Sequence, residues 1–174
     1  MSTWKTRKQN YRGDIMRYAS IRPMDITNGY GIGVALFTQG CPHHCPFCFN
    51  PETWNMGCNA GKEWTPEVEE EFMALVKRDH IVRVSFLGGE PLIDRNLETL
   101  LRLAKEIAAL HRKIYVWTGY TLEELKERDN PTLNELLKYI DVLIDGRFVF
   151  DLRDPNLELR GSSNQRILYL GKDY

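Results

Sequence analysis

The chain has 174 residues, a length that suggests one domain with a core large enough to be stable without disulfides. Hydrophobic residues make up 43% and the net charge is −1, so no strong basic field attracts nucleic acid or an anionic membrane surface. No run of 18 apolar residues is present and the first residues lack the apolar core of a secretory signal. We therefore expect a cytoplasmic protein with no membrane contact, in which thiols stay reduced.

Short apolar runs recur along the chain and predict β-strands. We expect strands at residues 33–38, 82–87, 114–118, 141–145 and 167–170, with an earlier one at 18–21. The first four of these runs each lead into a glycine and polar residues. Because the carboxyl ends of the strands form the site in parallel α/β folds, we expect these four segments to meet in one cleft.

Amphipathic stretches between the strands predict helices. Thr65, which is followed by proline, is an expected N-cap. A long helix is expected from about Asp94, where apolar residues recur at three- and four-residue steps. Thr121 and Glu124 form a capping box for a third helix, and a fourth is expected from about Thr132.

This alternation of strands and helices predicts an α/β fold with a parallel sheet covered by helices. A complete barrel of eight strand–helix units needs about 250 residues, so we expect an incomplete (β/α) barrel of about five or six strands, open on one side. We interpret residues 1–174 as a single domain, with residues 1–15 as an N-terminal extension. The open side of such a barrel suits a bulky substrate such as a polypeptide loop.

Three of the four cysteines lie close together in CPHHCPFC, residues 41–48. A structural zinc site usually takes four ligands, and Cys58 is the remaining cysteine that could complete one. Cys45 and Cys48 have the spacing of a thioredoxin-like pair, but that interpretation leaves Cys41 without a role. Three thiolates fit a four-iron cluster better, because one iron then stays open for a small molecule, as in catalytic metal sites. Cys41, Cys45 and Cys48 are therefore the predicted metal ligands.

CPHHCPFC resembles the CxxxCxxC signature of the radical S-adenosylmethionine enzymes, and GGEP at residues 88–91 resembles the second motif of that family. The segments TQGCPHHCPFCFNPETW, VWTGYTLEEL, DVLIDGRF and LRGSSNQRI resemble the activating proteins of anaerobic ribonucleoside-triphosphate reductases, over about residues 25–166. Two departures stand out. Tyr30 occupies the place of a proline in NGYG, and GGE replaces the GGD of close relatives.

The resemblance implies a radical S-adenosylmethionine oxidoreductase that carries a 4Fe-4S cluster and binds S-adenosylmethionine on its open iron. A reduced flavodoxin or ferredoxin then supplies one electron, and S-adenosylmethionine is cleaved to methionine and a 5′-deoxyadenosyl radical. That radical takes a hydrogen atom from a glycine near the C-terminus of the reductase, leaving a glycyl radical. Two alternatives stay open at this point: activation of another glycyl-radical enzyme, and a non-catalytic zinc-binding interaction module.

The resemblance also implies which residues surround S-adenosylmethionine, while the chemistry itself belongs to the cofactors. The expected cofactor-binding residues are Phe47, Cys48, Phe49, Gly88, Gly89, Glu90, Thr118, Asp145 and Arg147. For Phe47 and Phe49 the alternative is packing over the cysteine loop. For Asp145 and Arg147, which resemble an acidic–basic pair near the ligand carboxylate, the alternative is a surface ion pair.

Three further residues near the cysteine motif are expected to have no role in binding. We expect His43 and His44 to be exposed loop residues and Cys58 to be a bystander thiol.

Thr118, at the end of a predicted strand, either reaches the ligand or shapes the turn that follows. Among the GGE residues, Gly89 is the best candidate for the methionine site, because a glycine lets the backbone approach a ligand closely.

Overall fold

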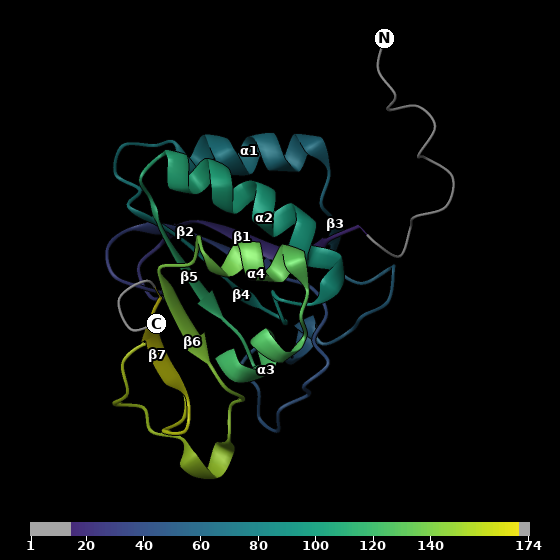
Figure 1. The fold of residues 1–174 in the computed structure, drawn as a ribbon, viewed down its shortest axis with the longest axis vertical. Helices are drawn as coiled ribbons and strands as arrows, with labels where there is room; N and C mark the ends of the chain where they lie inside the picture. Colours follow the sequence, from purple (N-terminus) through teal and green to yellow (C-terminus); the bar gives the residue numbers. More distant parts are fainter. Residues whose placement is uncertain (1–14, 171–174) are drawn as a thin grey trace.

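The computed structural model describes residues 15–170, which form one seven-stranded sheet with helices packed on one face (Figure 1). The predicted N-terminal extension, apart from Ile15, lies outside the described residues. Four strands at the centre run parallel: β2 (Gly33–Thr38), β4 (Arg83–Gly88), β5 (Lys113–Trp117) and β6 (Val142–Asp145). Three more run antiparallel to their neighbours: β1 (Arg17–Asp25), β3 (Lys62–Glu63) and β7 (Arg166–Tyr169). The strand order is β3-β1-β2-β4-β5-β6-β7.

Four α-helices connect or follow the strands. They are α1 (Pro66–Val76), α2 (Asp94–Ala109), α3 (Leu122–Glu127) and α4 (Pro131–Leu137), with short 3₁₀ turns η1 (Pro51–Thr53) and η2 (Phe150–Leu152). The predicted caps are confirmed: Thr65 accepts a hydrogen bond from the backbone N–H of Val68, and Thr121 and Glu124 form a capping box. None of the helices within residues 15–170 combines the length and apolarity that a membrane crossing requires.

The sheet is mixed and has seven strands, whereas the sequence predicted a parallel sheet of about five or six strands. Parallel neighbours need a crossover of a dozen residues or more, whereas β1 and β2 are joined only by residues 26–32. The link between β6 and β7 is longer but contains only the single turn η2, so β7 returns beside β6 in the antiparallel direction. β3 was missed because two residues carry no periodicity. The incomplete-barrel shape and the single-domain organisation stay predictions.

Successive residues of the central strands point to opposite faces of the sheet. Side chains on one face of the sheet, such as Val34 and Leu36 of β2, pack against α1, α2 and α4. On the helix side of this core, Leu100, Leu103 and Ile107 of α2 are fully buried. Burial of each such side chain contributes about 1.5–3 kcal/mol to stability. The opposite face is covered by loops instead of helices, and the candidate site lies on that side.

A buried ion pair lies at the amino ends of the parallel strands. The Arg83 guanidinium is fully buried and donates to the Asp25 carboxylate at 2.9 Å and to the Ser85 hydroxyl at 2.7 Å. Burial raises the pKa of Asp25, but hydrogen bonds from Arg83 and Asn28 outweigh it and hold that pKa below its usual value. A Cβ on Gly33 would lie 2.5 Å from the guanidinium, so this glycine makes room for Arg83.

Candidate functional site

The cysteine motif forms a loop that leaves the carboxyl end of β2 and returns to its own base. The backbone N–H of Gly40 donates to the carbonyl of Thr53 at 2.7 Å, and that of Cys41 donates to the carbonyl of Trp54 at 3.2 Å. The N–H of Glu90 donates to the carbonyl of Gly40 at 2.8 Å and holds the loop beside β4. The two backbones lie so close that a Cβ on residue 89 would be only 2.5 Å from the same carbonyl oxygen, so this position requires glycine. The two motifs predicted from the sequence are therefore in direct backbone contact.

A cavity of about 150 Å³ opens between this loop and the carboxyl ends of β4 and β5. Most of the predicted site residues line it: Cys41, Cys45, Cys48, Gly88, Gly89, Glu90 and Thr118. The other lining residues were not among those predicted as a site: His43, Asn50, Trp54, Leu87, Trp117, Gly119, Phe148 and Gln165. The prediction that several strand ends share one cleft is thus confirmed for β2, β4 and β5, while the segment after β6 contributes Phe148 in place of the predicted pair.

The three thiols are free and half-buried, which suits them to metal binding. Burial raises the pKa of Cys41 to about 11, and burial also raises the pKa of Cys45. Metals bind thiolates, so binding at this loop must release protons. Within residues 15–170, no three His, Cys, Asp or Glu side chains are arranged around a single ion position. Cys58 is exposed and lies outside the cavity that the other three cysteines line, so three thiols face this space, a number that suits a four-iron group with one open iron.

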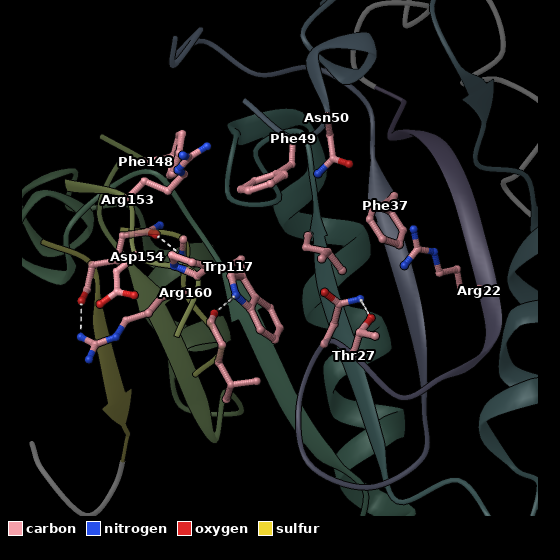
Figure 2. Close-up of a pocket in the computed structure, with 16 residues that line it drawn as sticks. Arg22, Thr27, Phe37, Phe49, Asn50, Trp117, Phe148, Arg153, Asp154 and Arg160 are labelled. Atoms are coloured by element: carbon pink, nitrogen blue, oxygen red, sulfur yellow. Dashed lines mark hydrogen bonds between the residues drawn. The ribbon is translucent and has the colours of Figure 1, made fainter. Parts of the chain in front are cut away.

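A larger cavity, of about 750 Å³, adjoins the first on the loop-covered face of the sheet. Five residues line both cavities: Asn50, Leu87, Trp117, Phe148 and Gln165. Figure 2 shows Trp117 in the middle of the view, with Phe37 and Arg22 on one side and Arg153, Asp154 and Arg160 on the other. Aromatic and guanidinium groups together suit a partly apolar ligand that carries peptide or carboxylate groups.

Comparison with known proteins agrees with this geometry. A family model described as a 4Fe-4S single cluster domain matches residues 27–168. The chain is 42% identical over 159 residues to the anaerobic ribonucleoside-triphosphate reductase-activating protein of Salmonella typhimurium, which covers 89% of this chain and 99% of the relative. The protein of the same description from Escherichia coli K12 is 40% identical with the same coverage. That of Enterobacteria phage T4 is 36% identical over 154 residues, covering 87% of this chain and 93% of the relative.

The chain belongs to the family of anaerobic ribonucleoside-triphosphate reductase-activating proteins. The resemblance predicted from its motifs is therefore confirmed, and its domain is of the 4Fe-4S type. Residues 41–48, which carry the three cysteines, fall inside the matched region. Binding of S-adenosylmethionine by the remaining predicted residues is a finer assignment and stays a prediction.

Glu90, predicted as a cofactor-binding residue of this family, has its carboxylate committed to protein groups. One oxygen accepts from the Thr118 hydroxyl at 2.8 Å and from the Leu92 N–H at 3.0 Å. The other accepts from the Gly119 N–H at 2.8 Å and lies 2.9 Å from Nε2 of His43. Glu90 is only 1% exposed. Glu90 and Thr118 therefore line the cavity as groups that already satisfy each other.

The expectation that His43 is an exposed loop residue is wrong. Its side chain is only 4% exposed, and its ring packs edge-on against Tyr120 with the centroids 4.5 Å apart. His44 is exposed, as expected, and lies beside the ring of Trp54. Nothing in the loop sequence separates the two histidines, because the groups that bury His43 come from the ends of β4 and β5.

Asp145 and Arg147 lie outside both cavities. Asp145 is buried and accepts hydrogen bonds from the N–H of Leu122 at 2.8 Å and from Nε of Arg166 at 3.0 Å. Arg147 is exposed. Within residues 15–170 the two form no ion pair with each other, so the alternative of an Asp145–Arg147 surface pair is wrong. Sequence spacing suggested a local partner, whereas the actual partner, Arg166, is supplied by the neighbouring strand β7.

Phe47 and Phe49 both pack against the segment that follows β6. The ring of Phe47 lies 4.3 Å from that of Phe150, and the ring of Phe49 lies 5.5 Å from that of Phe148, centroid to centroid. Phe47 also adopts a left-handed backbone conformation with φ of 58°. Of the two, Phe49 lines the larger cavity. Both rings stay largely exposed, Phe47 at 72% and Phe49 at 74%, and their contact with adenine stays a prediction.

Proposed function

We propose that this protein activates an anaerobic ribonucleoside-triphosphate reductase by cleaving S-adenosylmethionine reductively and abstracting a hydrogen atom from a glycine of the reductase. The observation that carries the proposal is the small cavity, in which three free thiols and the GGE backbone face the same space. The relatives described as activating proteins over nearly their whole length support the choice of partner. The product is a glycyl radical on the reductase.

In this proposal Cys41, Cys45 and Cys48 hold a 4Fe-4S cluster and leave one iron for S-adenosylmethionine. The bound group supplies one-electron chemistry, and the chain binds, orients and shields it. Gly88 and Gly89 present bare backbone to the small cavity, which lets the methionine part of the ligand approach closely. The thiols lose their protons as the metal group binds.

The larger cavity is the proposed entry for the glycine-bearing segment of the reductase. Its support is position, since it shares five lining residues with the small cavity and is wide enough for a stretch of polypeptide. A reduced flavodoxin or ferredoxin is the proposed electron donor. The cytoplasm, where free thiols persist, is the proposed compartment.

The test is a glycyl-radical assay under anaerobic conditions. The purified protein should be brown and hold about four irons with matching sulfide per chain. After reduction and addition of S-adenosylmethionine and the reductase, electron paramagnetic resonance should reveal a glycyl radical that is absent when S-adenosylmethionine is omitted. If the cluster is intact and S-adenosylmethionine is cleaved but no radical forms, the reductase is the wrong partner. A colourless protein with one tightly held zinc contradicts the whole proposal.

A further inference from the structure

The contact between His43 and Glu90 joins the two halves of the candidate site. His43 lies between the first two cysteines of the motif, and Glu90 directly follows the two glycines of GGE. Nε2 of His43 and Oε2 of Glu90 are 2.9 Å apart, and both side chains are almost fully buried. Since the partner is a carboxylate that already accepts backbone N–H groups, the ring nitrogen is the donor. This side-chain hydrogen bond connects the cysteine loop to the strand end that carries the proposed methionine site, in addition to the backbone bond from the Glu90 N–H to the Gly40 carbonyl.

The surroundings of His43 are built to receive its ring. Gly119 has no side chain where the imidazole lies, and a Cβ there would overlap the ring. Tyr120 closes the other side with an edge-on ring contact. The N–H of Gly119 donates to the same carboxylate oxygen of Glu90 that receives His43. The end of β5 thus supplies both the space for the imidazole and a second hydrogen bond to its acceptor.

The Glu90 carboxylate is buried and accepts from four donors of the chain, and burying such a group costs free energy. The loop does not need this group to bring its two ends together. Burying charged and polar groups is unfavourable unless their hydrogen bonds are made, and replacement by apolar residues is often neutral. The loop is already closed at its base by backbone hydrogen bonds from Gly40 and Cys41. The His43–Glu90 contact adds something different, namely a fixed position of the loop relative to Gly89 and Thr118.

We propose that His43 and Glu90 are positioning residues that hold the cysteine loop in register with the ends of β4 and β5 before any iron is bound. They thereby direct the open iron of the cluster toward the S-adenosylmethionine site. The second half of this inference rests on the proposed function, while the first half concerns the metal-free chain alone. A misplacement of about 1 Å at a reacting centre can cost about 100-fold in rate, so such a device has a measurable consequence.

His43→Ala is the decisive variant, and the adjacent His44→Ala is its matched control because His44 is exposed. In the metal-free protein, hydrogen exchange of residues 41–48 should become at least about tenfold faster in His43→Ala and stay unchanged in His44→Ala. After reconstitution, His43→Ala should retain about four irons, because its cysteines are intact. Its reduced cluster should lose the spectral change that S-adenosylmethionine causes in the wild type. Cleavage of S-adenosylmethionine should fall about 100-fold.

His43→Gln is the rescue variant, because its amide N–H can donate to Glu90 from a similar position. It should recover most of the spectral response, a result that a bulk packing role of the imidazole does not predict. Gly119→Ala offers an independent route, since its Cβ displaces the His43 ring while every residue of the loop and Glu90 itself stay unchanged. It should reproduce the His43→Ala phenotype. If His43→Ala fails to take up iron, the exchange measurement and the two other variants still decide the outcome.

Two results overturn the inference. One is wild-type exchange and a wild-type spectral response in His43→Ala. The other is a loosened loop with an unchanged response to S-adenosylmethionine, which assigns the pair to loop stability alone. If the cluster of the wild-type protein shows no spectral change with S-adenosylmethionine, that result contradicts the proposed function and not this inference. In that case the exchange experiment on the metal-free protein still tests whether the pair holds the loop.

Discussion

Polar groups at the amino ends of the parallel strands differ from the thiols at the carboxyl ends in whether they have partners within the chain. At the amino ends, the Arg83 guanidinium is fully buried against Asp25 and Ser85, so its main partners belong to the chain itself. At the carboxyl ends, three thiols face a cavity, and burial raises the pKa of Cys41 to about 11. The amino ends therefore pair their charged groups within the chain, as Glu90 does at the carboxyl ends, whereas the three thiols beside Glu90 are free.

The largest expected effect concerns the cysteines at the carboxyl ends of the parallel strands. Cys45→Ala should reduce iron from about four per chain to nearly none and abolish activation, because one of three ligands is lost. Cys58→Ala, at an exposed thiol, should leave both unchanged. Iron and sulfide analysis after anaerobic reconstitution measures this directly. Loss of the cluster in Cys58→Ala would show that the ligand set is wrong.

At the amino ends of the parallel strands, Arg83→Met should destabilise the metal-free protein by about 3–5 kcal/mol, because it leaves the Asp25 carboxylate buried without its cation. Arg102→Ala breaks an exposed pair with Glu69 and should cost less than about 1 kcal/mol. Urea unfolding of the two variants gives the comparison. Equal losses would mean that the amino ends are no more dependent on their ion pair than the surface is.

Gly89→Ala probes the backbone contact between the two motifs. Its new Cβ would lie 2.5 Å from the Gly40 carbonyl oxygen, so the loop must shift at a cost of about 1–3 kcal/mol. Weaker binding of S-adenosylmethionine should accompany this shift. Gly57→Ala is the control, since Gly57 is exposed and its nearest neighbour would be a movable Asn55 side chain. Wild-type affinity for S-adenosylmethionine in Gly89→Ala would contradict the placement of the methionine site.

The smallest expected effect is a pH dependence near α3. Hydrogen bonds from Arg166 lower the pKa of Glu123 to about 2, from a usual value near 4.5. Because the folded pKa is depressed, this contact stabilises the fold above about pH 4.5 and is lost as pH falls toward 2. Glu123→Gln should flatten that part of the stability profile of the metal-free protein. A carboxyl resonance of Glu123 that titrates near 4.5 would count against the contact.

Local patterns were enough to predict most of the elements and the core of the site. The strand at residues 33–38 was predicted correctly to the residue, and Thr65 and Thr121 cap their helices as expected, because periodicity and capping depend on neighbours in sequence. The cysteine motif and GGE were predicted to lie together because each comes at the carboxyl end of a predicted strand. These features require no knowledge of distant contacts.

The errors arise where distant segments meet. His43 was expected on the surface because its burial depends on Glu90 and Gly119, which the loop sequence does not reveal. The alternative role considered for Asp145 was an ion pair with Arg147 two residues away, whereas its partner Arg166 lies across a strand pair. Antiparallel pairing of β1 and β7 likewise depends on how the chain returns after a strand. Each miss reflects a tertiary contact that overrides a local pattern.

The common wall of the two cavities has a thermodynamic consequence. Trp117, Phe148 and Gln165 face the small cavity and the large one at once. A molecule that shifts these side chains from one cavity changes the shape of the other, so the two binding equilibria are linked. Linkage is reciprocal: whatever factor the cofactor adds to the affinity for the reductase, the reductase must add to the affinity for the cofactor. In the proposed function, with the cofactor in the small cavity and the reductase segment in the large one, the reductase therefore changes the affinity for the cofactor without any moving domain.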